Sequence, residues 1–132
     1  MAAPGLTTVR SKYSAKDTLD RLETEVKARG IEIFARIDHA AGATAVGLPL
    51  RPTTVLIFGN AKAGTPLMQA DQAVGIDLPL KAVVYEDSSG AVWLSYNDPH
   101  WIAQRHGLGA SVAANVEGLA KVLESVAAKA TA

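Results

Sequence analysis

The chain has 132 residues, 48% of them hydrophobic, and it balances 13 basic against 13 acidic side chains. This length and composition predict one globular domain over residues 1–132, with a core that needs no disulfide or metal to hold it. Since there is no cysteine, disulfides, thiol catalysis and thiolate metal sites are excluded. The balanced charge argues against a nucleic-acid partner, and no apolar run reaches the roughly 18 residues of a membrane-spanning helix. With no secretory signal visible at the start, we expect a cytoplasmic protein without a membrane partner.

The first part of the chain predicts a strand over residues 6–12 and then an amphipathic helix. Ser14 is the expected N-cap, and Gly30 is the expected left-handed residue after the helix. The apolar positions of this helix are spaced by three and four, and they are Leu19, Leu22 and Val26.

A half-buried strand is predicted over residues 31–38, because Ile31, Ile33, Ala35 and Ile37 alternate with Glu32, Phe34, Arg36 and Asp38. One or two helical turns are expected over residues 39–46. Residues 53–58 predict a further strand, apolar on both faces and therefore central in the sheet.

Thr65 and Pro66 predict the start of the next helix, which we expect to run to about Val74 and end at Gly75. Residues 80–86 and 91–96 predict an antiparallel hairpin, because only the short polar link 87–90 separates them.

A short helix is predicted over residues 99–106. Ser111 is the expected N-cap of a final helix. The apolar stripe of this last helix consists of Val112, Val116, Leu119, Leu123 and Val126.

The hairpin excludes a wholly parallel sheet. We therefore predict an α+β fold, a compact single-layer mixed or antiparallel sheet of about five strands with helices packed mainly on one face. The other face is either solvated or paired with a partner.

One short pattern occurs twice in the chain. Residues 45–51 (AVGLPLR) are similar to residues 73–75 (AVG) followed, after two further residues, by 78–81 (LPLK). In each copy a glycine ends a helix, and a proline prevents its continuation before the next strand. We interpret the pattern as two uses of one helix-to-strand connection, with duplication as the alternative.

Five phrases of the sequence, taken together and in order, resemble the small bacterial family called domain of unknown function 302. They are FARIDH (34–39), LIFGN (56–60), GTPLM (64–68), DLPLK (77–81) and WLSYNDP (93–99). The resemblance covers about residues 5–108, and it implies a compact α+β fold that forms a homodimer. It implies no catalytic role, because the family has no established activity. The helix expected over about residues 111–129 then lies beyond the family core as an addition.

Polar residues at two predicted strand ends form the first candidate site. Asp38 and His39 close one strand, and Asn97, Asp98 and His100 follow another. If these ends converge, His39 could serve as a general base oriented by Asp38 or Asp98. The alternative is local: Asp38 and Asp98 could each cap a helix that begins after them.

The segment between Gly59 and Thr65 is the second candidate, since it leaves a strand and leads to a helix N-terminus. Asn60 and Lys62 could bind a small anion there. The segment lacks the Gly-Lys-Ser/Thr ending of a phosphate-binding P-loop, so nucleotide hydrolysis is rejected. An ordinary strand-to-helix turn is the alternative.

A metal site is not predicted, because His100 and His106 are six residues apart and no histidine pair has zinc-enzyme spacing. No cofactor is predicted either, although haem bound through His39 stays open as an alternative.

Trp93 is predicted to share a strand face with Ser95 and Asn97, opposite the apolar face of Val92, Leu94 and Tyr96. Either a second subunit or a helix of the same chain must then cover the tryptophan.

From these observations we expect a homodimeric module that binds or responds to a small, anionic ligand near Asp38–His39 and Asn97–Asp98. The alternatives are a small enzyme that uses His39 as its base, and haem or metal binding through His39. Whether the chain is an enzyme is left open.

Overall fold

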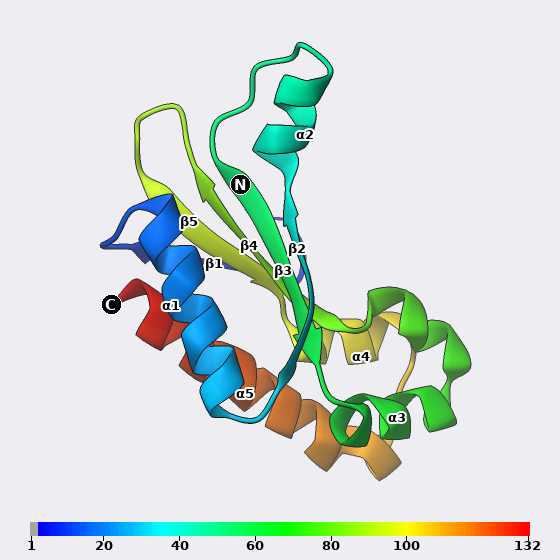
Figure 1. The fold of residues 1–132 in the computed structure, drawn as a ribbon. Helices are drawn as coiled ribbons and strands as arrows, with labels where there is room; N and C mark the ends of the chain where they lie inside the picture. The colour runs from blue at the N-terminus through cyan, green and yellow to red at the C-terminus, as the bar shows by residue number, and fades with distance from the viewer. Residues whose placement is uncertain (1–2) are drawn as a thin grey trace.

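The computed structural model describes residues 3–132. It contains a five-stranded sheet in the order β1-β5-β4-β3-β2, and every neighbouring pair is antiparallel (Figure 1). The strands are β1 (Leu6–Ser11), β2 (Glu32–Asp38), β3 (Thr53–Gly59), β4 (Leu80–Glu86) and β5 (Val92–Asn97). The helices are α1 (Ala15–Ala28), α2 (His39–Ala45), α3 (Ala61–Ala70), α4 (Pro99–Arg105) and α5 (Ala113–Thr131), with 3-10 turns η1 (Gln72–Asp77) and η2 (Ala110–Val112). The predicted α+β class and antiparallel sheet are confirmed.

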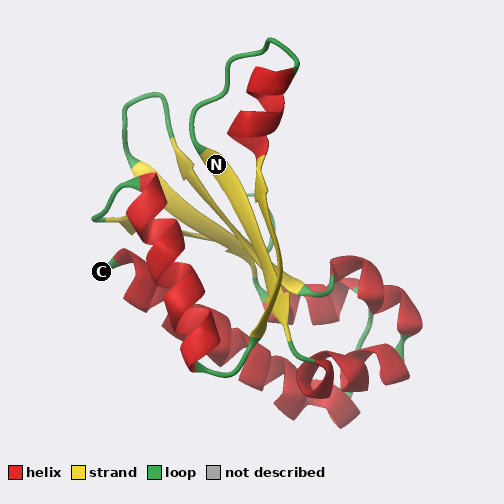
Figure 2. Cartoon of the chain, in the orientation of Figure 1, coloured by secondary structure: helices red, strands yellow, loops and turns green. Residues whose placement is uncertain are grey.

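Helices α1 and α5 pack against each other and cover one face of the sheet (Figure 2). Between them and the sheet lies the core, in which Leu22, Phe58, Leu94 and Leu123 are at most 1% exposed. Burying one such side chain stabilises the fold by about 1.5–3 kcal/mol. This covered face therefore supplies most of the hydrophobic stabilisation.

Among the helices of residues 3–132, none covers the opposite face of the sheet, which we call the open face (Figure 1). A row of paired residues crosses it from one edge to the other, and Ser95 in this row bonds Thr8 hydroxyl to hydroxyl at 2.8 Å. The row consists of Thr8, Ser95, Val83, Val55 and Ile37.

Local signals determine helix α1 as expected. The Ser14 hydroxyl accepts a hydrogen bond from the Asp17 N–H at 3.1 Å, and Gly30 has a φ of +70°. Lysine, aspartate and glutamate alternate along the exposed side, with a Lys16–Asp20 pair at 2.7 Å.

Strand β2 departs from the simple alternation predicted for it, because a bulge lies between Ile33 and Ala35. Ile33 pairs with buried Phe58 on the covered face, whereas Ile37 pairs with Val55 on the open face. A bulge adds one unpaired residue to a strand, so the side chains after it point to the opposite face from the one that simple alternation predicts. The prediction that the isoleucines share one face is therefore wrong.

Helix α3 begins earlier than predicted, at Ala61 instead of Thr65. The Asn60 side chain accepts a hydrogen bond from the Ala63 N–H at 2.7 Å, which provides the cap. Pro66 lies inside the helix rather than at its first position. The predicted segment over 65–74 is divided between α3 and η1, because Asp71 ends one and caps the other.

Helix α5 begins at Ala113 without a side-chain cap, so Ser111 is not its N-cap. Ser111 lies in η2, which leads directly into the helix. The predicted apolar stripe is confirmed, since each of its five members is buried against the core. The β4–β5 hairpin is confirmed as well.

Candidate functional site: a cavity at one end of the sheet

The two groups of strand-end residues predicted to share a pocket lie at opposite ends of the sheet. Strands β2 and β5 run antiparallel to each other with β3 and β4 between them, so Asp38 and Asn97 lie at opposite ends of the sheet. Figure 1 shows α2 beyond one end and α4 at the other. The predicted common pocket is therefore wrong, and Asp98 does not orient His39.

Asp38 and His39 begin helix α2, which contains no buried residue. The Asp38 carboxylate accepts a hydrogen bond from the Ala41 N–H at 2.9 Å, so it caps the helix, and His39 is exposed. A hollow of about 530 Å³ beside Asp38 is lined by charged groups that include Lys16, Arg36 and Glu86. No group of three side chains suited to a metal occurs within residues 3–132. Haem binding through His39 stays a prediction.

Asp98 and His100 connect α4 to α5. The Asp98 carboxylate caps α4 by accepting from the His100 N–H at 2.9 Å, and the imidazole lies 2.7 Å from the Glu117 carboxylate. The hydrogen bond to Glu117 raises the pKa of His100 above its ordinary 6.5, and Asp98 at 3.0 Å adds to the effect. Asn97 is half-buried at the end of β5, opposite Leu6. The side chains of Asp98 and His100 therefore have structural partners.

The second candidate segment, from Gly59 to Thr65, is a helix start rather than an open loop. Asn60 uses its side-chain oxygen for the cap of α3, and Lys62 is exposed in the first turn of the helix. Because the Asn60 side chain accepts from the N–H of the third helical residue, the cap interpretation accounts for this segment.

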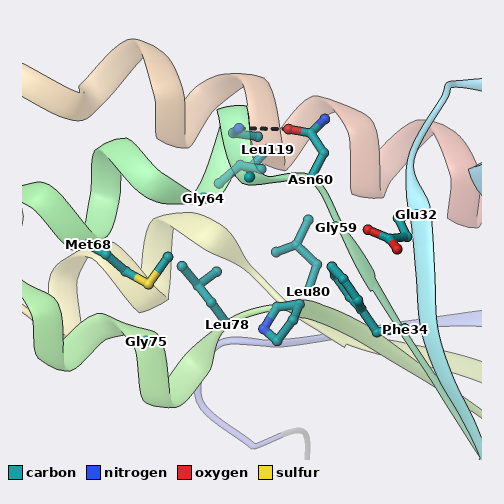
Figure 3. A pocket seen from close by; sticks show the side chains of 13 residues that line it. Glu32, Phe34, Gly59, Asn60, Gly64, Met68, Gly75, Leu78, Leu80 and Leu119 are labelled. Carbon is teal, nitrogen blue, oxygen red and sulfur yellow. Dashed lines mark hydrogen bonds between the residues drawn. The ribbon is translucent and has the colours of Figure 1, made fainter.

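A cavity of about 310 Å³ lies at this same end of the sheet, between α3, η1 and the start of β2 (Figure 3). Ligand sites in proteins have volumes of about 300–1,000 Å³ and walls that are mainly apolar with few polar groups. Only Glu32 and Asn60 contribute polar side chains to the lining. The apolar side chains of the lining are those of Phe34, Met68, Leu78, Pro79, Leu80 and Leu119, with the alanines of α3 beside them.

Glycines keep this cavity open. A Cβ atom at Gly59 would lie 3.4 Å from the Pro79 ring and 3.6 Å from the Phe34 ring. At Gly75 a Cβ atom would lie 3.4 Å from the Met68 sulfur. Sequence reasoning missed the cavity, although the glycines around a methionine were a signal that the backbone approaches closely there.

An ion-paired cluster supports the η1 wall of the cavity. The Asp77 carboxylate lies 2.9 Å from the Arg105 guanidinium and 2.6 Å from Nε2 of His106. The side chains of Asp77 and His106 are only 13% and 11% exposed. The cluster therefore connects η1 to the end of α4.

Trp93 lies on the open face, where its indole N–H donates to the Asp87 carboxylate at 2.8 Å. This hydrogen bond, with a second from Ser89, lowers the pKa of Asp87. The Arg10 guanidinium lies 5.8 Å from the centre of the tryptophan ring. Trp93 is thus positioned by neighbours but not covered by a helix, and Phe34 and Ile37 on the same side are 50% and 42% exposed.

These features define a small α+β domain with a one-sided antiparallel sheet and an apolar cavity at one end. The family model described as "Domain of unknown function DUF302" matches residues 7–126, and the chain belongs to this family. The match extends through most of α5, which we had expected to lie beyond the family core.

A crystal structure of an uncharacterized conserved DUF302 protein from Bacillus stearothermophilus has the same fold. The TM-score is 0.85 at 20% sequence identity, over 97% of this chain and 99% of that chain. The likeness therefore includes α5 and the strand order.

Two curated relatives are each named "Fluoride-specific ion channel FluC 1", one from Brucella suis biovar 1 and one from Brucella abortus biovar 1. Each is 50% identical over 107 residues, which is 81% of this chain but 42% and 40% of the relatives. The chain thus spans about two fifths of the length of the curated relatives it matches. Within residues 3–132, no helix combines the length and the apolar character that crossing a bilayer requires.

Proposed function

We propose that this domain is a binding module that holds a small, mainly apolar ligand in the cavity between α3, η1 and the start of β2. The observation that carries the proposal is the 310 Å³ space itself, open to solvent and walled by apolar side chains. The larger hollow beside Asp38 is lined by several charged groups, whereas the lining of this cavity is mainly apolar. A space of this size and lining is what a ligand site requires.

Two helical glycines provide a matched test of the cavity. A side chain at Gly64 would point toward Leu78 and Met68, whose nearest atoms are 3.8 and 3.9 Å from the added Cβ, whereas Gly42 in α2 has nothing within 4 Å. We expect Gly64→Leu to fill the cavity and Gly42→Leu to leave it open.

The measurement is a titration with 1-hexanol, followed by amide chemical shifts. In the unaltered protein the shifts should be confined to residues around Gly59, Gly64 and Gly75, and they should vanish in Gly64→Leu but persist in Gly42→Leu. If Gly64→Leu retains its dispersed spectrum and still binds hexanol with unchanged shifts, the cavity is not the binding site.

The module is proposed to be a homodimer in which the open faces of two copies pair. The row from Thr8 to Ile37 contains no charge, so pairing two copies along this row brings no like charges together there, and Arg10 and Lys81 lie on the same face to either side of it. Trp93, held in place by Asp87, is the type of residue that anchors interfaces. The family resemblance also predicts a homodimer, which supports a second copy of this chain as the partner that covers the open face.

Light scattering after size exclusion tests the dimer. Ile37→Lys places a charge on the open face and should give a monomer, while Val46→Lys, at a position that is 71% exposed beyond the sheet end, should leave the dimer intact. If the unaltered protein is a monomer, the proposed dimer is wrong, whereas the proposed ligand site in the cavity is unaffected.

The relatives named as fluoride channels lead to a proposal about which part of those proteins has which function. We infer that channel activity belongs to the part of those proteins that this chain does not match, and that a domain like this one binds a ligand in the cytoplasm beside the channel. The coverage of about two fifths supports this. Liposomes loaded with fluoride and mixed with this protein alone should show no efflux above the lipid background. Efflux that rises with protein concentration would contradict the inference.

A further inference from the structure

The geometry points to a small amphiphilic amine as the class of ligand that the cavity takes, with its cationic head at Glu32 and its apolar tail between α3 and η1. This inference rests on the proposed function and adds the charge of the ligand to it. Three features of the cavity carry it: the position of Glu32, the absence of a cation in the lining, and the ring of Phe34.

Glu32 is the first residue of β2, and its carboxylate is directed toward Gly59 at the mouth of the cavity (Figure 3). It pairs across the sheet with Gly59, a residue without a side chain that could cover it. Among the residues that the structure describes, no basic group lies within ion-pairing distance of Glu32. In contrast, Asp20 and Glu23 of α1 are both paired with Arg36. Within residues 3–132, Glu32 therefore has no ionic partner, and a ligand can provide one.

The rest of the lining lacks any positive charge. Its only other polar side chain is that of Asn60, whose oxygen is engaged by the Ala63 N–H at 2.7 Å. Lys62, which sequence reasoning assigned to an anion, is exposed on α3 and does not line the cavity. An anionic ligand would thus meet a carboxylate without a compensating cation, and like charges at short range repel.

Phe34 adds an aromatic surface to the same side of the cavity mouth. Its ring comes within 3.6 Å of the position that a Cβ atom at Gly59 would occupy, and half of the residue is exposed. The bulge that follows Ile33 keeps both Glu32 and Phe34 beside Gly59 while the rest of β2 changes face. A carboxylate and an aromatic ring at one entrance together favour a cation, since the ring face attracts positive charge. The apolar interior favours an alkyl or aryl tail.

The test uses three probes with the same six-carbon tail: n-hexylamine, 1-hexanol and hexanoate, each titrated at pH 7 and fixed ionic strength. Amide shifts of the labelled protein give the dissociation constants. We expect hexylamine to bind about two- to fivefold more tightly than hexanol, the range that one exposed ion pair provides, and hexanoate to bind most weakly. Glu32→Gln should reduce the hexylamine preference to about one, and Glu32→Lys should make hexanoate the preferred probe.

Glu86→Gln is the matched control, because Glu86 lies at the opposite end of the sheet and lines the hollow near Asp38. It should leave the order of the three probes unchanged. If hexanol binds the cavity and hexylamine binds no more tightly, the amine inference is overturned while the binding module stands. If none of the three probes shifts the residues around Gly59 and Gly75, the proposed function itself fails.

Discussion

Two connections of this chain have the same local design but opposite surroundings. In β2–α2–β3 and in β3–α3–η1–β4, a strand ends at a side chain that caps the next helix, Asp38 in the first and Asn60 in the second. The first connection leaves Val46 and Leu48 71% and 62% exposed beyond the sheet. The second buries Leu67 and Val74 almost completely.

The difference comes from the helices that lie at each end of the sheet. Helix α3 packs against α5, and η1 packs against α4, so the second connection becomes a wall with a cavity behind it. Helix α2 packs on β3 and extends past the end of the sheet (Figure 1). The comparison shows that capping residues define where a helix begins, whereas its neighbours determine whether it encloses a site.

The largest expected effect comes from removing matched leucines in the two connections. Leu67→Ala should lower the free energy of unfolding by about 2–5 kcal/mol, because it leaves a void under a side chain that is 1% exposed. Leu48→Ala should change it by at most about 0.5 kcal/mol, as for other surface substitutions. Urea denaturation of both variants measures the difference. Equal losses would mean that the first connection is covered in solution, for example by the second copy.

An intermediate effect is expected at Asp77, which ties the second connection to α4. Asp77→Asn should cost about 1–2 kcal/mol of unfolding free energy, since it removes the charge that Arg105 and His106 share. It should also increase amide exchange in η1 and weaken hexanol binding. Asp38→Asn is the control in the first connection and should be nearly neutral, because asparagine caps a helix as well as aspartate. Unchanged exchange in η1 of Asp77→Asn would show that the cluster does not support the cavity wall.

The smallest expected effect concerns pH and the contact between α4 and α5. The hydrogen bond that the His100 imidazole donates to the Glu117 carboxylate raises the pKa of His100 in the folded protein above 6.5, its ordinary value. The protonated imidazole therefore stabilises the fold fully below about pH 6.5, and this contribution is lost as the pH rises through the higher folded pKa. The site is exposed, so added salt should weaken the effect.

Titration of the His100 ring by NMR measures this shift directly. In Glu117→Gln the pKa of His100 should fall back toward 6.5, and the unfolding free energy should depend less on pH between 6 and 8. A His100 titration that is identical in both proteins would contradict the assigned hydrogen bond.

Much of the fold could be predicted from short-range patterns. Ser14 and Gly30 define helix α1 through hydrogen bonding and a positive φ, and both act within a few residues. The polar link from Asp87 to Gly90 predicted the hairpin for the same reason. The stripe of α5 was also predicted correctly, since a helix repeats its face every three to four residues.

The errors occurred where local signals compete or where distance in space matters. Both Asn60 and Thr65 can cap a helix, and the earlier one is used because the chain from Ala61 already packs toward α5. The bulge in β2 leaves no mark in an alternating sequence, so the face of Ile37 was assigned wrongly. The pairing of Asp38 with Asn97 assumed neighbouring strand ends, and strand order is a property of the assembled sheet.

By itself, the sequence determined the α+β class, the Ser14 cap of α1 and the apolar faces of α1 and α5, because these depend on contacts within a few residues. Only the tertiary structure decided that Asp38 and Asp98 lie at opposite ends, and that Glu32, Phe34 and Gly59 meet beside Met68 and Leu78. These residues come from β2, β3, α3 and the C-cap of η1, and they are spread over residues 32–78 of the sequence. They lie close together only after the strand order and the helix packing at this end of the sheet are established.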